Sequence, residues 1–306
     1  MPTDWSVVTW MQRWRQQSTL WRAPSSGQEH FYLETNNCCV IPLENDEFTI
    51  YSSTQAPAKH QKYVAHVLGV PAHKVVSKTK RLGGGFGGKE TRSIFLHCAV
   101  AVPAHALRRP VKLSLDRDED MQMTGQRHAF MCRYKVGHTS EGRITALDYK
   151  LYNNAGNSWD LSAAIMDRCL LHCDNVYKVD NMRVAGRLCR TNQASNTAFR
   201  GFGGPQMTVE QVARAVGRPV HEVRELNMYQ EGDVTHFKQV LEVFRAPTCW
   251  KEVKASSQYE ERMKQARVAT NSNGVLQGYL DDRGHSVVES SALLCQMPQF
   301  DPRPAL

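Results

Sequence analysis

The chain has 306 residues, a hydrophobic fraction of 41% and a formal net charge of +8, which suits one large globular domain or two ordinary ones. No apolar run approaches the roughly 20 residues of a membrane-spanning helix, and residues 1–20 lack the apolar core of a secretory signal. Nine scattered cysteines without a C-x-x-C pair argue against a disulfide framework, a zinc ribbon or an iron–sulfur site within the chain.

The charge and the thiols suggest a class of partner and a compartment. The lysines and arginines are dispersed, and the densest basic patch, Lys74 to Arg81, has no aromatic side chains interleaved with it. A solvated basic face or an anionic small molecule therefore explains the charge better than nucleic acid does. The cysteines are best explained as reduced thiols. We expect a cytoplasmic protein without a nucleic-acid partner and without a membrane association.

Turn residues and hydrophobic spacing divide the chain into short elements. Residues 1–26 show no sustained periodicity, so we expect an irregular leader. Apolar or alternating runs predict strands at 48–52, 75–76, 111–115, 130–136, 144–152 and 183–188. Helical spacing predicts helices at 56–68, 93–104, 163–172, 209–216 and 220–228. The predicted fold class is α+β, with mixed sheets and helices and no regular β-α-β alternation.

The pattern decays after residue 245. Residues 251–269 are highly charged and compatible with a helix, and residues 271–306 lack clear periodicity. We therefore expect three segments: the leader 1–26, a folded domain 27–245, and a charged, poorly ordered tail 246–306. Limited proteolysis would remove such a leader and tail first.

A stretch with five glycines in six positions runs from Gly83 to Gly88. Such a loop exposes backbone N–H groups and lets an anion or a large cofactor approach closely. With Lys89 it nearly matches a phosphate-binding P-loop, but that motif next requires Ser or Thr for a magnesium ion. Glu90 stands there instead, and its carboxylate would repel a phosphate. A nucleotide-binding protein is therefore kept only as an alternative.

Six stretches resemble, in order, signatures of the molybdenum hydroxylases, the family of xanthine dehydrogenases and aldehyde oxidases. The longest are GGGFGGKETR at 83–92 and SNTAFRGFGGPQ at 195–206, and the others lie at 27–35, 53–55, 115–121 and 231–237. The resemblance implies about the first half of the family's molybdenum-cofactor-binding domain, and so an incomplete α+β fold. It also implies the family's reaction, the oxidative hydroxylation of purines such as hypoxanthine and xanthine to urate.

The resemblance implies a molybdenum–molybdopterin cofactor whose metal is held by the pterin, so no protein residue is expected to be a metal ligand. Gln55 matches the residue that hydrogen-bonds an oxo group of the metal centre. Phe86 and Gly87 match the loop that lies against the metal, and Arg200 matches an arginine beside the cofactor. These four residues are the candidates for cofactor binding.

Three further residues match the family's substrate pocket. Phe202 would contact a flat ring, while Glu90 and Arg168 would bind its polar edges, with Arg168 also stabilising negative charge on a purine oxygen. The two charged residues favour the xanthine branch, because a small apolar aldehyde would leave both charges poorly paired.

No catalytic residue is assigned within the chain. The resemblance implies that the general-base Glu belongs to the second half of the domain, and that the flavin and iron–sulfur domains precede this region. These parts are not expected in this chain. The family is homodimeric. Whether the chain is itself an enzyme is left open, with an inactive truncated remnant or a binding-only module as the alternative.

Overall fold

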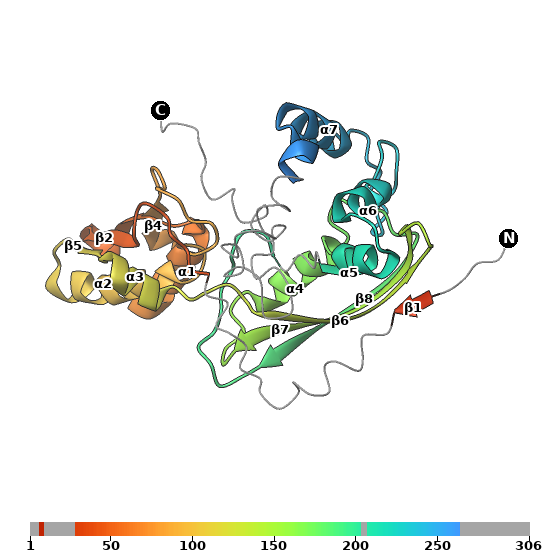
Figure 1. Ribbon diagram of the computed structural model, residues 1–306. Coiled ribbons are helices and arrows are strands. Elements are labelled where there is room, and N and C mark those ends of the chain that lie inside the picture. Colours follow the sequence, from red (N-terminus) through yellow and green to blue (C-terminus); the bar gives the residue numbers. More distant parts are fainter. Residues whose placement is uncertain (1–5, 9–27, 203–206, 264–306) are drawn as a thin grey trace.

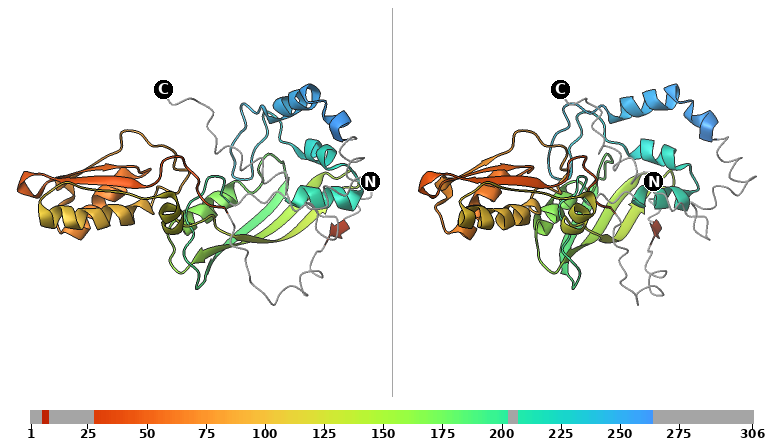
Figure 2. Two further views of the ribbon diagram at one scale, coloured as in Figure 1. Left: turned by 60° about the vertical axis from the view of Figure 1, so that its left-hand side comes forward. Right: turned by 90° about the vertical axis from the view of Figure 1, so that its left-hand side faces the viewer.

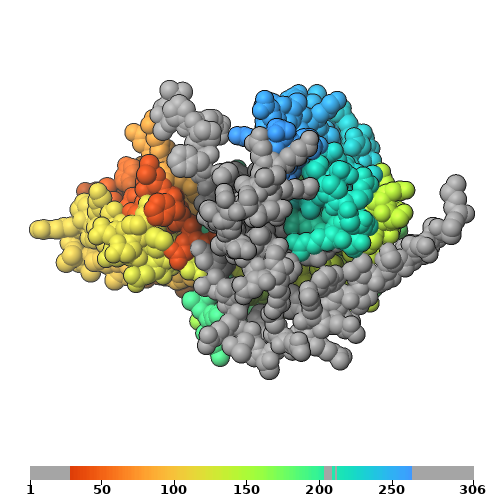
Figure 3. All heavy atoms as spheres, in the orientation of Figure 1, coloured from red at the N-terminus to blue at the C-terminus, as the bar shows by residue number. Residues whose placement is uncertain are grey.

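The computed structural model describes residues 6–8, 28–202 and 207–263, which fold into two α+β units that lie side by side (Figure 1). Each unit has a four-stranded sheet with helices packed on it. Figure 3 shows the units as two lobes, one coloured red to yellow and the other green to blue. This architecture confirms the α+β class expected from the sequence.

The sheet of the first unit has the strand order β4-β3-β2-β5. Its strands are β2 (Asn37–Pro42), β3 (Phe48–Ser52), β4 (Val75–Lys78) and β5 (Val111–Ser114). Strands β3 and β4 are parallel, so α1 (Pro57–Leu68) is the crossover that a parallel pair requires. The short helices η2 (Glu44–Asp46), η3 (Ala72–Lys74) and α3 (Arg117–Met123) complete the unit together with α2 (Ser93–Leu107).

The core of the first unit lies between the sheet and the helices α1 and α2, which cover one face of it (Figure 2). Alternate residues of the strands point into this core, among them Phe48 and Ile50, and Val64 and Val100 meet them from the two helices. Burial of side chains of this size stabilises the fold by about 1.5–3 kcal/mol each.

The second sheet has the strand order β1-β6-β7-β8. Its strands are β1 (Ser6–Val8), β6 (Phe130–His138), β7 (Ile144–Gly156) and β8 (Asn181–Arg190). The parallel pair β7–β8 is joined by α4 (Ser162–Leu171). Helices α5 (Met207–Val216) and α6 (Val220–Asn227) pack against each other, and α7 (Ala246–Ser256) follows.

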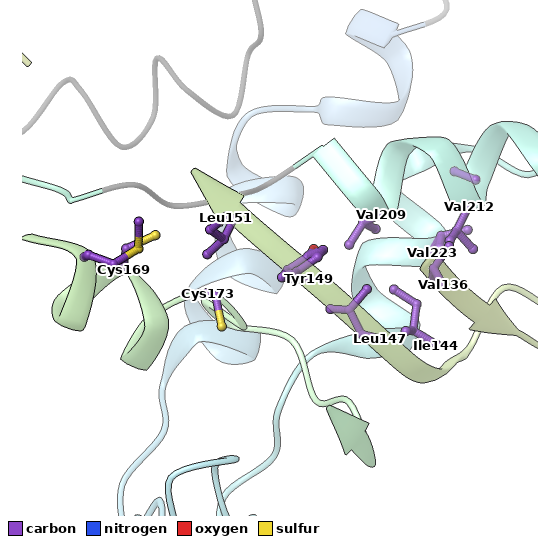
Figure 4. Packing of buried hydrophobic residues seen from close by; sticks show 12 residues of the cluster. Val136, Ile144, Leu147, Tyr149, Leu151, Cys169, Cys173, Val209, Val212 and Val223 are labelled. Atoms are coloured by element: carbon purple, nitrogen blue, oxygen red, sulfur yellow. The ribbon is translucent and has the colours of Figure 1, made fainter. Parts of the chain in front are cut away.

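The core of the second unit gathers side chains from β6, β7, α4, α5 and α6. Figure 4 shows Tyr149 and Leu151 of β7 in this cluster with Val212 of α5. Cys169 and Cys173 are buried in the same cluster. Burial raises the pKa of both thiols to about 12, so neither is a thiolate near neutral pH.

The predicted strands and helices between residues 48 and 228 are confirmed, with ends that shift by a few residues. Besides the short helices η2 and η3, strand β2 and helix α3 of the first unit were not predicted. Strand β2 reads NCCVIP, a sequence without alternation of polar and apolar residues, although alternate side chains of the strand are buried. Helix α3 begins with a capping box formed by Asp116 and Glu119, a pattern that the sequence displays.

Two expectations about the ends of the chain are wrong in part. Residues 6–8 of the expected irregular leader pair with β6 as an antiparallel strand. Helix α7 lies in the expected poorly ordered tail, where Trp250 and Lys254, one helical turn apart, both bind Glu225 of α6. The rest of the two segments lies outside the described residues, apart from 257–263. No helix in the described part of the chain is long and apolar enough to cross a membrane.

Candidate functional site

The two glycine-containing loops meet at the junction of the two units. The backbone N–H of Arg200 donates to the carbonyl of Phe86 at 3.0 Å. Gly87 approaches the second loop so closely that a Cβ there would lie 2.3 Å from the carbonyl oxygen of Ala198. One loop side chain reinforces the junction, since Arg92 donates through Nη2 to the carbonyl of Ser195 at 2.6 Å. Sequence stretches more than 100 residues apart thus form one surface.

Gln55 lies directly against the first glycine loop. Its Oε1 accepts hydrogen bonds from the backbone N–H of Gly87 at 2.9 Å and of Lys89 at 3.3 Å. Because both partners are donors, the oxygen must be the atom that faces the loop. A Cβ on Gly85 would lie 2.5 Å from the same oxygen, so the contact requires glycine. Among the described residues Nε2 of this exposed side chain has no hydrogen-bond partner, which leaves it as a donor for a ligand.

Phe86 and Arg200 occupy the tips of the two loops. Phe86 is half-buried and has a φ of 52°, a left-handed conformation that a bulky residue rarely adopts. Strained backbone of this kind is concentrated at functional sites. Arg200 is exposed, and its carbonyl accepts a hydrogen bond from Nη2 of Arg127 at 2.8 Å. The tip conformations are therefore held from outside the loops.

His30 and Arg127 both support the second loop through the ring of Phe199. The His30 ring stacks on Phe199 with centroids 4.3 Å apart, and the Arg127 guanidinium lies 4.0 Å from the Phe199 ring. Nε2 of His30 is 2.8 Å from the carbonyl of Ala198. Burial lowers the pKa of His30 to about 4, so the ring is neutral near pH 7 and donates to this carbonyl as the Nε2–H tautomer.

Lys89 is fully buried beneath the first loop. Its Nζ donates to the carbonyl oxygen and Oε2 of Glu34 and to Oγ of Ser53. Burial alone would raise the pKa of the Glu34 carboxyl, but hydrogen bonds from Gly83, Ser53 and Asn37 and the charge of Lys89 lower it to about 2. The ammonium thus has a carboxylate partner within the protein. A P-loop needs this lysine to bind a phosphate, so the nucleotide-binding alternative gains no support.

The three candidate substrate residues are less closely gathered. Phe202 lines a cavity of about 10 Å³ with Phe199 of the same loop and Ile165 of α4. That volume is close to what a single water molecule needs. Arg168 lies one turn beyond Ile165 on α4 and is exposed, while Glu90 is paired with Lys59 at 3.4 Å. Neither Glu90 nor Arg168 lines this cavity, so the described residues do not by themselves enclose a purine beside Phe202.

The surface fits a large anionic cofactor better than a bare metal ion. Glycines without Cβ atoms leave room along the first loop, Nε2 of Gln55 is available as a donor, and the charge of Arg200 is exposed next to Phe86. Within the part of the chain that the structure describes, no group of three His, Cys, Asp or Glu side chains could hold a metal ion.

The sequence analysis missed the residues that hold the loops in place. His30, Glu34 and Ser53 all lie within signature stretches, yet their roles depend on contacts with residues 36 to 168 positions away. One feature of the sequence did indicate such contacts, namely a lysine directly after the glycine stretch. A buried lysine that binds no phosphate needs an acidic partner. The sequence alone cannot show which carboxylate that is.

Residues 22–228 match the family model of the molybdopterin cofactor-binding domain. The chain is 51% identical over 247 residues to xanthine dehydrogenase 1 of Arabidopsis thaliana, covering 78% of this chain and 18% of that protein. It is 53% identical over 247 residues to the xanthine dehydrogenase/oxidase of Felis catus, covering 78% of this chain and 19% of that protein. The chain thus spans about a fifth of the length of these relatives.

The fold is similar to that of the aldehyde oxidoreductase from Desulfovibrio gigas, with a TM-score of 0.68 and 25% sequence identity. The similarity covers 78% of this chain and 27% of that one.

Proposed function

The chain belongs to the molybdopterin cofactor-binding family, and from this premise we propose that it forms one part of the catalytic centre of a xanthine dehydrogenase-like molybdenum hydroxylase. The proposed reaction is the oxidative hydroxylation of a purine such as hypoxanthine or xanthine. The observation that carries the proposal is the junction of two glycine-containing loops around Gln55, whose oxygen is engaged by the loop while its Nε2 remains a donor. A cytoplasmic location and homodimeric assembly belong to the same proposal.

Four residues would hold the cofactor, and each has a chemical reason. Gln55 would donate from Nε2 to an electronegative atom of the metal centre, in an orientation fixed by the two N–H groups on its Oε1. Phe86 and Gly87 would face the cofactor with a loop that has little side-chain bulk. Arg200 would add a positive charge beside an anionic group. When bound, molybdenum–molybdopterin supplies the oxidising centre that the side chains lack.

Three residues would orient the purine. Phe202 would contact the face of the ring, since aromatic rings in contact prefer offset or edge-to-face arrangements. Glu90 and Arg168 would bind the polar edge, with Arg168 stabilising negative charge that develops on a purine oxygen. Lys59 is 3.4 Å from Glu90, so this ion pair would have to break before Glu90 could bind the substrate. No general base is among the roles proposed for this chain.

The test is to purify the 306-residue chain from a host that synthesises molybdopterin and to measure molybdenum and pterin per chain. We expect both in the unsubstituted chain and a loss of several-fold in Gln55→Ala. Gln122→Ala is the matched control, because Gln122 is exposed on α3, and it should retain the unsubstituted content. Absence of both molybdenum and pterin, or equal retention in Gln55→Ala, would count against the proposal and favour an inactive remnant.

A further inference from the structure

Lys89 has an unusually complete set of partners for a lysine in a glycine loop. Its side chain is fully buried. Nζ donates to the Glu34 carbonyl at 2.6 Å, to Oε2 of Glu34 at 3.2 Å and to Oγ of Ser53 at 2.7 Å. An ammonium has three N–H donors, and here each has an acceptor. The ring of Tyr32 lies 4.4 Å from Nζ and adds a cation–π contact.

Glu34 connects this ammonium to the other end of the loop. Its Oε2 accepts from the backbone N–H of Gly83 at 2.7 Å and from Oγ of Ser53 at 2.7 Å. Its backbone N–H also donates to the carbonyl of Gly83 at 3.0 Å. Because one carboxylate binds both Gly83 and Lys89, the first glycine of the stretch and the lysine that follows its last glycine are fixed to the same side chain.

The backbone of Lys89 is bonded as fully as its side chain. Its carbonyl accepts from the N–H of Gln55 at 2.9 Å, from Oγ1 of Thr54 at 3.0 Å and from Oγ of Ser93 at 3.1 Å. Its N–H donates to Oε1 of Gln55 at 3.3 Å. Gln55 is therefore bound to Lys89 through both its backbone and its side chain. Glu90 follows Lys89 directly in the chain.

We propose that Lys89 is a positioning residue, whose buried ammonium fixes the glycine loop through Glu34 and Ser53 so that Gln55 faces the cofactor and Glu90 faces the substrate. The inference rests on the proposed function for the roles of Gln55 and Glu90. A neutral side chain of similar length would fill the space but would leave the acceptors of Glu34 and Ser53 without their donor. Unpaired buried groups of this kind are costly, so the loop would rearrange to reach other donors.

The experiment compares the cofactor-free 306-residue chain with Lys89→Met, using two readouts that need neither cofactor nor turnover. The first is the pair of side-chain NH₂ resonances of Gln55 in a ¹⁵N-labelled chain, assigned by their loss in Gln55→Ala. The second is amide hydrogen exchange in peptides that cover residues 83–90. In Lys89→Met we expect the Gln55 resonances to move toward those of glutamines whose Oε1 is bound only to water. We expect amide exchange in the loop to accelerate about tenfold, the factor that one hydrogen bond to a charged group supplies.

Val64→Ala is the control for a merely structural effect. Val64 is fully buried in the core of the same unit, so its truncation lowers the free energy of unfolding without touching the loop. It should leave the Gln55 resonances and the relative protection of the loop unchanged. If Lys89→Met does not fold, Ser53→Ala removes one of the three acceptors and should shift both readouts in the same direction by less.

The inference would be overturned if the Gln55 resonances and the amide exchange of the loop stayed unchanged in folded Lys89→Met, or in Ser53→Ala when that variant is used instead. The same holds if Val64→Ala reproduces the shift. Failure of the chain to retain molybdopterin would instead contradict the proposed function, and the two results are independent.

Discussion

At Gly87 a single residue determines whether the two glycine-containing loops can meet. Its φ of 101° is unfavourable for any residue with a Cβ, and a Cβ would lie 2.3 Å from the carbonyl oxygen of Ala198. We predict that Gly87→Ala lowers the free energy of unfolding by about 3 kcal/mol, from backbone strain and overpacking together. Urea denaturation measures the loss.

The matched control is Gly69→Ala at the end of α1. Gly69 also has a positive φ, 67°, but an added Cβ there would meet nothing within 4 Å. Backbone strain alone should lower the free energy of unfolding by about 1 kcal/mol. Equal losses in the two variants would show that the contact between Gly87 and Ala198 is not a tight one.

Buried histidines make a second prediction at the residue scale, about pH. Burial lowers the pKa of His30 to about 4, of His97 to about 3 and of His128 to about 4, and it also lowers the pKa of His60. Between pH 6.5 and about 4 the unfolded chain therefore binds more protons than the folded chain, so stability rises with pH across this window. We predict that the free energy of unfolding falls by about 3 kcal/mol from pH 6 to pH 5.

Urea denaturation at several pH values tests this. The slope of the unfolding free energy with pH gives the number of protons taken up on unfolding, and His97→Asn should reduce that number by about one. His73 is exposed, so His73→Asn should leave the slope unchanged. The depressed pKa of Glu34, about 2, adds stability that is present above its ordinary value of 4.5 and is lost only as the pH falls toward 2. A stability that is flat between pH 7 and pH 5 would contradict the burial of these rings.

At the scale of elements, local sequence signals were sufficient wherever one face of an element is solvated. Helix α1 has a proline in its first turn and a left-handed Gly69 at its end, and both signals are visible in the sequence. The hairpin β6–β7 alternates around the turn at 139–142. Strand β2 was missed because the run from Cys38 to Ile41 shows no alternation of polar and apolar residues, although the strand buries alternate side chains, and a short apolar run cannot be assigned from periodicity alone.

Helix α7 was not expected, because it lies in the charged segment that begins at residue 246. The sequence from 246 onwards is charged, and charge without apolar periodicity is typical of poor order. Helix α7 is instead attached through polar contacts, with Trp250 Nε1 and Lys254 Nζ each 2.7 Å from Oε1 of Glu225. Such contacts depend on which carboxylate of α6 lies opposite α7, and the hydrophobic periodicity of the sequence does not show this.

We predict that Glu225→Ala releases α7 without unfolding the rest of the second unit. The Lys254 pair is partly exposed, so it contributes at most about 1 kcal/mol, which corresponds to about a fivefold change in the population of the detached helix. Chymotrypsin should therefore cut after Trp250 several times faster in the variant. Glu252→Ala, on an exposed face of α7, should be cut at the original rate. Unchanged cleavage in Glu225→Ala would mean that other contacts hold the helix.

At the scale of the whole molecule, the candidate site belongs to the junction of the two units and to neither unit alone. Gln55 and Gly87 come from the first unit, and Ala198 and Arg200 from the loop that enters α5. Periodicity could predict the elements on either side, but it could not show that the two loops meet. The motif resemblance placed residues of both loops beside one cofactor, and the contacts between Phe86 and Arg200 and between Gly87 and Ala198 are what the structure adds. The enclosure of a purine by Glu90, Arg168 and Phe202 stays a prediction.

For the whole chain we predict no sustained formation of urate from xanthine. The two carboxylates next to the glycine loop are poor general bases. Glu34 already accepts four side-chain or backbone donors and has a pKa of about 2, far below the operating pH at which a base is most effective. Glu90 is paired with Lys59 and is assigned to the substrate. Loss of general-base catalysis alone reduces the rate by about 10²–10⁴-fold.

The measurement supplies the chain, purified from a host that makes molybdopterin, with xanthine and an artificial electron acceptor, and follows urate by absorbance. The acceptor removes the need for an electron relay, so a negative result bears on the chemistry at the two loops. Sustained urate formation that disappears in Glu90→Ala or Arg168→Ala, but persists in the surface control Glu252→Ala, would show that this chain is sufficient for the reaction and would contradict the prediction. In that case Glu90 would have to leave its ion pair with Lys59 and act as the general base. Lys59→Met removes that competing partner, so its activity would rise rather than stay unchanged.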